Sequence, residues 1–296
     1  MLKNRLKLNA KKIDLFLKNY IKNQKRSSLI NPMNYGVLSG GKKIRSSVIL
    51  ATGKFYNLKI NKLLNVCGAV ECIHSYSLIH DDLPCMDDDK LRRGKPTAHI
   101  KYGESTAVLA GNSLLTLAFE MISDRKFKIK NNHKVLLIKK LAECSGHTGI
   151  AGGQELDLRY EKKRKKFNEI INMQRKKTGK LFSFCCFAAG QIAGKNKIEN
   201  TKLNKLGEDI GLLFQLADDF LDIKGKSKYT GKTVNKDRKK GKSTIISLVG
   251  YNYTYDYAMK LKKKILRNLE KHGKKANDLK EIVNFILERK YWWQNF

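Results

Sequence analysis

The chain has 296 residues, of which 41% are hydrophobic and 30% charged, and its formal net charge of +34 leaves enough apolar residues for a sizeable core. None of the six cysteines belongs to a C-x-x-C pair, so free buried thiols in a reducing cytoplasm are expected rather than disulfides. The basic N-terminus lacks the continuous apolar core of a signal peptide, and no apolar stretch is expected to reach the roughly 20 residues of a membrane span.

Helical periodicity dominates the sequence, and the alternation typical of strands is nearly absent. There are only 3 prolines, a scarcity that long helices need because an internal proline costs about 3 kcal/mol. The chain is therefore expected to be all-α, as one large helical domain over residues 1–296. In chain order, the pattern predicts helices near 5–22, 42–57, 62–82, 104–122, 132–148, 168–193, 202–223, 243–250, 254–271 and 276–290. Polar connections are expected at 32–41, 84–97 and 225–241.

Two acidic clusters adjoin strongly apolar helical turns. Runs of Asp lower helix propensity and repel one another, and at a helix C-terminus they also meet the negative end of the dipole. Mg²⁺ would offset these costs because it prefers carboxylate oxygens together with substrate phosphates. The alternative, a solvated acidic face, is less favoured in so basic a chain. The first cluster contains Asp81, Asp82, Asp87, Asp88 and Asp89, and the second contains Asp218, Asp219 and Asp222.

Helical spacing predicts which residues of the second cluster share one face. Residues at i, i+3 and i+7 share one face of a helix. We therefore expect Gln215, Asp218 and Asp222 to line up, with the opposite face packed in the core.

Three basic segments accompany the acidic clusters, as a site for metal ions and diphosphates would require. Gly40 and Gly41 precede a helix whose free N–H groups could meet an anion. Arginine side chains after the first Asp cluster could grip phosphate bidentately. A third segment after the second Asp cluster runs from Gly231 to Lys242. The Gly-Gly-Lys loop lacks the spacing of a P-loop. Most of the remaining Lys excess fits solvated helix faces.

These residues resemble the motifs of bacterial short-chain trans-isoprenyl diphosphate synthases. The resemblance runs from about residue 33 to 290 and keeps the family's order of motifs. It covers the run HSYSLIHDDLPCMDDD followed by LRRGKPT, the second motif DDFLD at 218–222, and Gly-Gly-Lys-x-x-Arg at 40–45. It also covers Gly-Gly-Gln-x-x-Asp at 152–157, Lys177-Thr178 and Phe214-Gln215. The sequence departs from the family at Ser46, Asn112, Asn235 and Ile245-Ile246, where no metal or phosphate ligand is lost.

The resemblance implies an isoprenoid-synthase fold with a central active-site cavity, Mg²⁺ as cofactor, and a role for each matching residue. Mg²⁺ would be bound from one wall by Asp81 and Asp87, supported by Asp82 and Asp88, and from the other by Asp218 with Asp222. The allylic diphosphate would be held by Arg92, Lys177, Lys232 and Lys242, and isopentenyl diphosphate by Lys42, Arg45, His74 and Arg93. Lys177, Thr178 and Gln215 would present oxygen dipoles to an allylic cation, and with Arg92 and Lys232 they form the expected catalytic set.

The implied reaction is the head-to-tail condensation of isopentenyl diphosphate with an allylic diphosphate. In this family, bulk just before the first Asp limits product length, so Tyr76 and Ser77 favour farnesyl over geranylgeranyl diphosphate. The alternative for Tyr76 is ordinary core packing. The resemblance also implies a homodimer, whereas nucleic acid is not an expected partner.

Three other classes of protein are less favoured. A terpene cyclase would lack the second-substrate site of Lys42, Arg45 and His74. A basic helical binding protein would not need acidic clusters. A non-catalytic regulatory subunit would lose the Asp motifs, and this chain keeps both.

Overall fold

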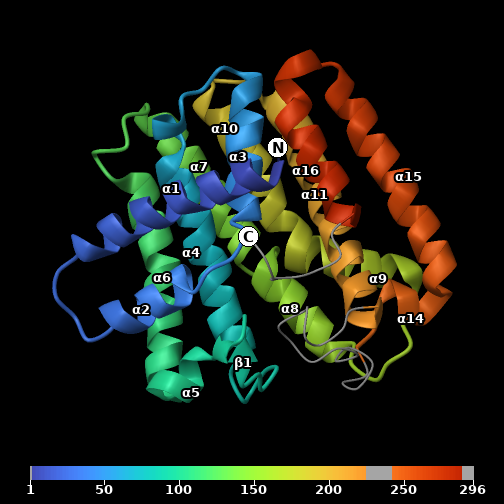
Figure 1. The fold of residues 1–296 in the computed structure, drawn as a ribbon, viewed down its shortest axis with the longest axis horizontal. Helices are drawn as coiled ribbons and strands as arrows, with labels where there is room; N and C mark the ends of the chain where they lie inside the picture. Colours follow the sequence, from blue (N-terminus) through green and yellow to red (C-terminus); the bar gives the residue numbers. More distant parts are fainter. Residues whose placement is uncertain (1, 225–241, 289–296) are drawn as a thin grey trace.

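The computed structural model describes residues 2–224 and 242–288, and nearly all of its secondary structure is helical (Figure 1). The all-α prediction is confirmed. The chain opens with α1 (Leu2–Lys22), α2 (Ile30–Leu38), α3 (Ile44–Phe55), a 3-10 turn (Ile60–Lys62) and α4 (Leu64–Asp81). Helix α1 buries one stripe of apolar residues, as an amphipathic helix does, made of Leu6, Ile13, Leu17 and Ile21.

The middle of the chain contains the remaining core helices. A short antiparallel ribbon, β1 (Leu91–Arg92) with β2 (Lys95–Pro96), leads into α5 (Ala98–Tyr102). There follow α6 (Glu104–Ser123), α7 (Asn131–Ser145), α8 (Ile150–Arg159), α9 (Phe167–Gln174), a π-helical turn (Arg175–Gly179) and α10 (Lys180–Ile192).

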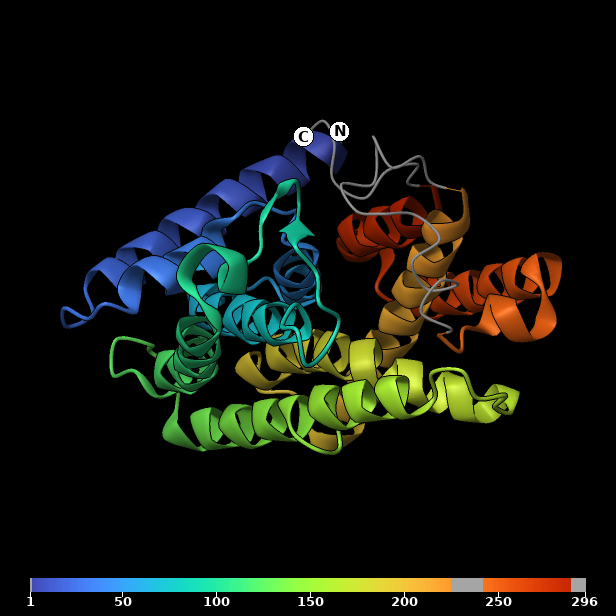
Figure 2. The same cartoon turned by 90° about the horizontal axis from the view of Figure 1, so that it is seen from below.

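The C-terminal helices flank the long helix α11 (Lys197–Lys224). They are α14 (Ile245–Val249), α15 (Tyr251–Glu270), a 3-10 turn (Gly273–Ala276) and α16 (Asn277–Glu288). In the interior, α4 packs on α6 and α3, while α10 packs on α11, α3 and α7. Figure 2 shows these helices surrounding the end of α4, where the acidic loop begins. The first aspartate motif therefore lies at one end of the bundle (Figure 1), where Asp82 is buried and Asp88 is exposed.

Helix α2 overlaps the connection expected at 32–41, and α8 lies between the predicted helices 132–148 and 168–193, where no helix was predicted. Helix α2 contains Pro32 at its third position, and proline is tolerated in a first turn because the N–H groups there have no intrahelical acceptor. Helix α8 contains Gly152 and Gly153, and glycine weakens a helical pattern by about 1 kcal/mol per residue. The helix expected at 168–193 is a continuous run of α9, the π-turn and α10.

One further expectation needs correction, because α6 is long and apolar enough by length and composition to cross a membrane. About 44% of its apolar window is buried inside the structure, and the helix packs on α4 and α2. Core helices of soluble proteins pass the same test, so α6 is weak evidence for a span.

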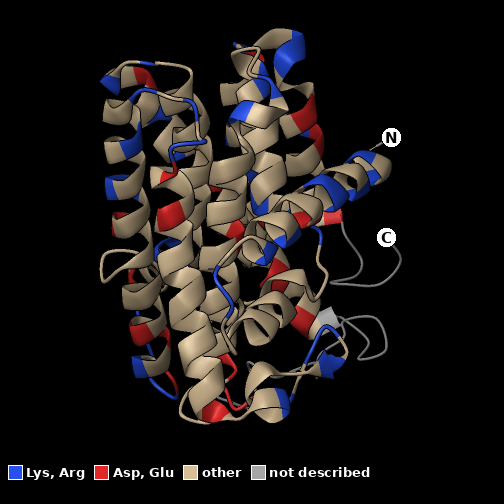
Figure 3. Ribbon diagram, turned by 90° about the vertical axis from the view of Figure 1, so that its left-hand side faces the viewer, with Lys and Arg blue, Asp and Glu red and all other residues tan. Residues whose placement is uncertain are grey.

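Basic residues in Figure 3 are scattered along several helices instead of gathering in one patch. This distribution agrees with the interpretation of most Lys side chains as solvated helix faces. The basic residues that matter for function must therefore be identified by their contacts.

Candidate active site

The loop after α4 folds back onto the end of that helix. The N–H of Asp87 donates to the carbonyl of Asp81 (2.8 Å), and the N–H of Asp89 donates to the carbonyl of Asp82 (3.1 Å). These bonds satisfy carbonyl groups that a helix C-terminus leaves without intrahelical partners. The two halves of the first aspartate motif are thereby brought side by side.

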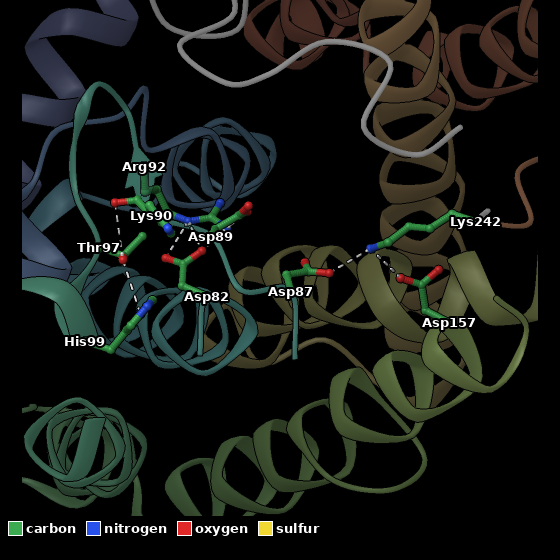
Figure 4. Close-up of polar contacts among 9 residues, drawn as sticks. All are labelled: Asp82, Asp87, Asp89, Lys90, Arg92, Thr97, His99, Asp157 and Lys242. Atoms are coloured by element: carbon green, nitrogen blue, oxygen red, sulfur yellow. Dashed lines mark hydrogen bonds and ion pairs between the residues drawn. The ribbon is translucent and has the colours of Figure 1, made fainter. Parts of the chain in front are cut away.

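Arg92 of the β-ribbon is paired with the acidic loop (Figure 4). Its Nε donates to both carboxylate oxygens of buried Asp82 at 2.7 Å, and a terminal nitrogen lies 3.5 Å from Asp89. Asp82 was predicted to support a metal and Arg92 to hold a phosphate. In the structure these two side chains bind each other, so either ligand would have to compete with this ion pair.

Lys177 and Lys242 converge on a single carboxylate from α8. Lys177 Nζ lies 2.6 Å and Lys242 Nζ 3.2 Å from Asp157 Oδ2, and Lys242 Nζ is also 3.1 Å from Asp87 Oδ1. Figure 4 shows Lys242 reaching between the two carboxylates. Burial alone would raise the pKa of Asp157, but the two ammonium groups outweigh it and lower that pKa. A positive charge thus joins α8 to the first aspartate motif.

The charge on Asp81 is less well compensated. Burial raises the pKa of its carboxyl group, and the nearby Asp87 raises it further, although Lys177, Arg92 and Lys242 oppose this. A buried carboxylate with a like charge beside it favours a proton or a metal cation.

Close backbone packing places Lys177 and Thr178 in the site. Both lie in the π-turn, a rare element that is often found at functional sites. A Cβ on Gly153 would lie 2.2 Å from the backbone nitrogen of Lys177, and a Cβ on Gly211 would lie 2.7 Å from Cα of Gly179. Only glycine allows α8 and α11 to approach the π-turn this closely. The Gly-Gly-Gln-x-x-Asp element therefore brings Asp157 within reach of Lys177.

The second aspartate motif lines the pocket through Asp219, and the metal-binding role predicted for Asp218 and Asp222 stays a prediction. Asp219 is buried, and together with Gln215 it lines a pocket, whereas Asp218 and Asp222 are half-buried on the same helix. Thr178 donates its hydroxyl proton to Gln215 Oε1 at 2.8 Å. The pocket is bounded by α8, α9, the π-turn, α11 and residues 242–244, and its lining includes Asp157, Lys177 and Lys242.

The residues expected to hold the second diphosphate form a cationic group. Arg93 lies against the glycine loop, where its guanidinium donates to the carbonyl of Gly40. The guanidinium of Arg45 lies 5.0 Å from the centre of the Phe182 ring. Burial and the neighbouring Arg92 and Arg45 lower the pKa of Arg93 to about 10. An anion bound here would relieve this mutual repulsion.

Lys42 and Lys43 differ in their surroundings. Lys42 Nζ lies 4.9 Å from the centre of the Phe285 ring on α16. Lys43 is buried, donates to the carbonyl of Val37 at 2.6 Å and lies 3.3 Å from Asp14. Lys43 therefore has a structural role, and Lys42 is the lysine of the pair that could meet an anion.

His74 should be neutral at neutral pH. Burial and then the charges of Arg45, Arg93, Lys43 and Arg92 lower its pKa well below 6.5. Arg45→Gln should raise this pKa because Arg45 contributes the largest charge effect, and NMR titration of the imidazole would measure it. The unfolded chain takes up this proton first, so stability should fall as pH drops below about 6.5.

Lys42→Gln is the matched control, because Lys42 is not among the charges with the largest effects on the pKa of His74. It should change that pKa much less than Arg45→Gln does. A wild-type His74 that titrates at its ordinary value would contradict this description of the cationic group.

The residues expected to limit product length lie one turn before the acidic loop. Tyr76 is 9% exposed, its ring meets that of His80 edge-on at 5.6 Å, and its hydroxyl lies 3.5 Å from the carbonyl oxygen of Ser145. Ser77 is half-buried and donates to the carbonyl of His74 at 2.9 Å. Tyr76 is therefore a fixed bulky side chain between α4 and α7.

Sequence and structure comparisons agree on the family. Residues 26–286 match the family model described as polyprenyl synthetase. The chain belongs to the polyprenyl synthetase family. Farnesyl diphosphate synthase of Escherichia coli is 39% identical over 88% of this chain and 89% of that protein.

Two crystal structures show the same fold as this chain. An apo FPP/GFPP synthase from Zymomonas mobilis has a TM-score of 0.85 and 35% identity, covering 97% of this chain and 98% of that one. A Helicobacter pylori geranyltransferase complexed with magnesium and isoprenyl diphosphate has a TM-score of 0.81 and 31% identity, covering 97% and 96%.

The carboxylate groups of the first aspartate motif supply the oxygen donors that a divalent cation prefers. Asp81 and Asp87 are adjacent, and the ammonium of Lys242 between Asp87 and Asp157 shows that a positive charge is stable there. Within the described ranges, no three His, Cys, Asp or Glu side chains gather closely enough to hold a metal. Several of the acidic side chains are instead paired with cationic or amide groups: Asp82 with Arg92, Asp87 and Asp157 with Lys242, and Asp219 with two glutamines.

The sequence analysis gave no individual role to Asp157, Asp219 or Gln174, all of which line the pocket. Asp157 is the last residue of the Gly-Gly-Gln-x-x-Asp element, and Asp219 is the second Asp of its motif, four residues after Gln215. The places of Asp157 and Asp219 within these motifs could have identified both residues from the sequence. Gln174 had no such signal. Lys232, predicted to be catalytic, lies outside the described residues, as do Asn235 and the rest of the 225–241 connection.

Proposed function

We propose that this chain is a Mg²⁺-dependent prenyltransferase that condenses isopentenyl diphosphate with dimethylallyl and then geranyl diphosphate to give farnesyl diphosphate and diphosphate. The observation that carries the proposal is the pair Lys177 and Lys242, held by buried Asp157 and facing Asp87. Facing walls of one site thus offer carboxylates for a metal and ammonium groups for a diphosphate. Family membership and the names of the relatives support the same reaction.

Mg²⁺ and the two diphosphates would bind to different sets of residues in the site. Asp81 and Asp87, with Asp218 and Asp222 from the other wall, would hold Mg²⁺, with Asp82 and Asp88 in support. The allylic diphosphate would take Lys177, Lys242, Arg92 and Lys232 as donors. Isopentenyl diphosphate would lie at the cationic group formed by Lys42, Arg45, His74 and Arg93.

The chemical step breaks the allylic carbon–oxygen bond and forms a carbon–carbon bond. When bound, Mg²⁺ would supply positive charge that neutralises the departing diphosphate. Because Thr178 donates its proton to Gln215, its lone pairs are free to face the developing allylic cation. The proton lost after condensation goes to the released diphosphate, so no side-chain base is required. Neutral His74 serves as a phosphate ligand.

Product analysis of the full-length protein tests the proposal. With Mg²⁺, labelled isopentenyl diphosphate and geranyl diphosphate, wild type should form farnesyl diphosphate as its main product. Tyr76→Ala should shift the main product to longer chains, because it removes the bulk between α4 and α7. Chromatography of the dephosphorylated products measures both.

The outcomes separate the alternatives. If wild type formed geranylgeranyl diphosphate, the family reaction would stand and farnesyl diphosphate would be ruled out as the end product. The relative from Zymomonas mobilis is named an FPP/GFPP synthase, so a protein of this fold carries more than one product in its name. Condensation with neither primer, in folded protein that binds Mg²⁺, would leave a non-catalytic regulatory or basic binding role.

The proposal also includes a homodimer of single-domain chains in the cytoplasm. The homodimer is carried over from the family resemblance. All 6 cysteines are free, which supports a reducing compartment.

A further inference from the structure

The carboxylate of Asp219 receives hydrogen bonds from two glutamine side chains. Gln174 Nε2 on α9 donates to Asp219 Oδ2 at 2.9 Å, and Gln215 Nε2 on α11 donates to Asp219 Oδ1 at 2.9 Å. Gln174 and Asp219 are each 3% exposed. The bond from Gln174 is therefore shielded from water, and the bond from half-buried Gln215 is partly shielded. Hydrogen bonds to a charged group are stronger when water is excluded.

This arrangement determines which end of each amide faces the pocket. An ionised carboxylate can only accept hydrogen bonds, so both glutamines must turn their NH₂ groups toward Asp219. The oxygen of Gln215 is then directed away from Asp219, where it accepts the hydroxyl proton of Thr178. If the Gln215 amide were reversed, it would present N–H donors to Thr178 and to a developing cation.

Gln174 completes the arrangement from the opposite side. It is the last residue of α9, directly before the π-turn that contains Thr178. Its own Oε1 is buried at the pocket and has no hydrogen-bond partner among the described residues. Leaving this buried oxygen without a donor costs free energy. Gln174 therefore keeps its hydrogen bond to Asp219 at a local cost to stability.

We infer that Gln174 and Asp219 are positioning residues that fix the amide of Gln215 with its oxygen toward Thr178 and the substrate. This inference rests on the proposed function, because it concerns the cation that the prenyl transfer would form. Gln174 acts through Asp219, and Asp219 acts through Gln215. Neither needs to contact the substrate for its loss to lower the rate.

Gln174→Met tests the inference, since methionine has similar size but cannot donate to Asp219. In the full-length protein with Mg²⁺, kcat should fall roughly tenfold while KM for both diphosphates stays within about twofold, because the affected oxygen matters mainly in the transition state. Gln174→Glu should be slower still, because its carboxylate cannot donate and repels Asp219.

A double-mutant cycle distinguishes positioning from general packing. In a Gln215→Met background, Gln174→Met should change kcat by less than about twofold, because the amide that it orients is already absent. Gln191→Met is the matched control: this buried glutamine bonds His133 and Asn200 away from the pocket. It should lower thermal stability as Gln174→Met does but leave kcat unchanged.

Two results would overturn the inference. One is an equal loss of kcat from Gln174→Met with and without Gln215. The other is an unchanged kcat in Gln174→Met when wild type is active. If wild type itself formed no condensation product, the proposed function would fail, and the two failures are therefore distinguishable.

Discussion

Asp81→Asn should lower kcat/KM for the condensation by about a thousandfold. Asp81 ends α4 beside Asp87, and its raised pKa reflects a buried carboxyl group whose charge is poorly compensated. Losing one metal carboxylate would remove several kcal/mol of transition-state charge stabilisation, and each 1.36 kcal/mol is worth a factor of ten. Steady-state rates at increasing Mg²⁺ would show both the loss of rate and a higher Mg²⁺ requirement.

Asp256→Asn is the control for this variant. Asp256 is exposed on α15, so its replacement makes the same change of net charge outside the pocket. It should leave the rate and the Mg²⁺ requirement unchanged. Wild-type Mg²⁺ dependence in Asp81→Asn would remove Asp81 from the proposed metal ligands.

Asp157→Asn should destabilise the fold by roughly 3–5 kcal/mol, the usual cost of breaking a buried ion pair from one side. It leaves the ammonium groups of Lys177 and Lys242 close together without their shared carboxylate. Because the pKa of Asp157 is lowered in the folded state, its stabilising effect is complete at neutral pH and is lost in acid. The difference from wild type in urea denaturation should therefore shrink as pH falls below about 4.

Added inorganic diphosphate should restore much of the stability of Asp157→Asn, because the anion can neutralise the same two lysines. Asp209→Asn provides the comparison. Asp209 is 1% exposed and pairs with Arg175 and Lys264 at 2.9 Å each, outside the pocket lining. It should lose stability without being rescued by diphosphate. Equal rescue of both variants would show that the anion acts nonspecifically.

The sequence predicted the helices whose apolar stripes are regular and uninterrupted. Helix α1 buries Leu6, Ile13 and Leu17 at helical spacing, as the pattern indicated. The predictions were wrong where a helix depends on its neighbours. Pro32 in α2 and the two glycines in α8 weaken the local signal, and packing against other helices compensates for that weakness.

The motifs likewise showed which residue types belong to the site but not how they are paired. Spacing on an isolated helix placed Gln215 with Asp218 and Asp222, whereas the pocket contains Asp219, which is bonded to Gln174 from another helix. Arg92 and Asp82 were assigned different ligands and are bonded to each other. These pairings join residues 10 and 45 positions apart in the chain, so no local periodicity could reveal them.

The sequence by itself determined the all-helical class, the two acidic motifs and the family, because these depend on local periodicity and on short runs of residues. Tertiary structure alone decided that Lys177, Lys242 and Asp157 share one buried contact and that Asp219 orients two amides. The physical reason is distance: ion pairs and hydrogen bonds act over about 3 Å. Only the close approach of α8 and α11 to the π-turn, at Gly153 and Gly211, brings these side chains within that range.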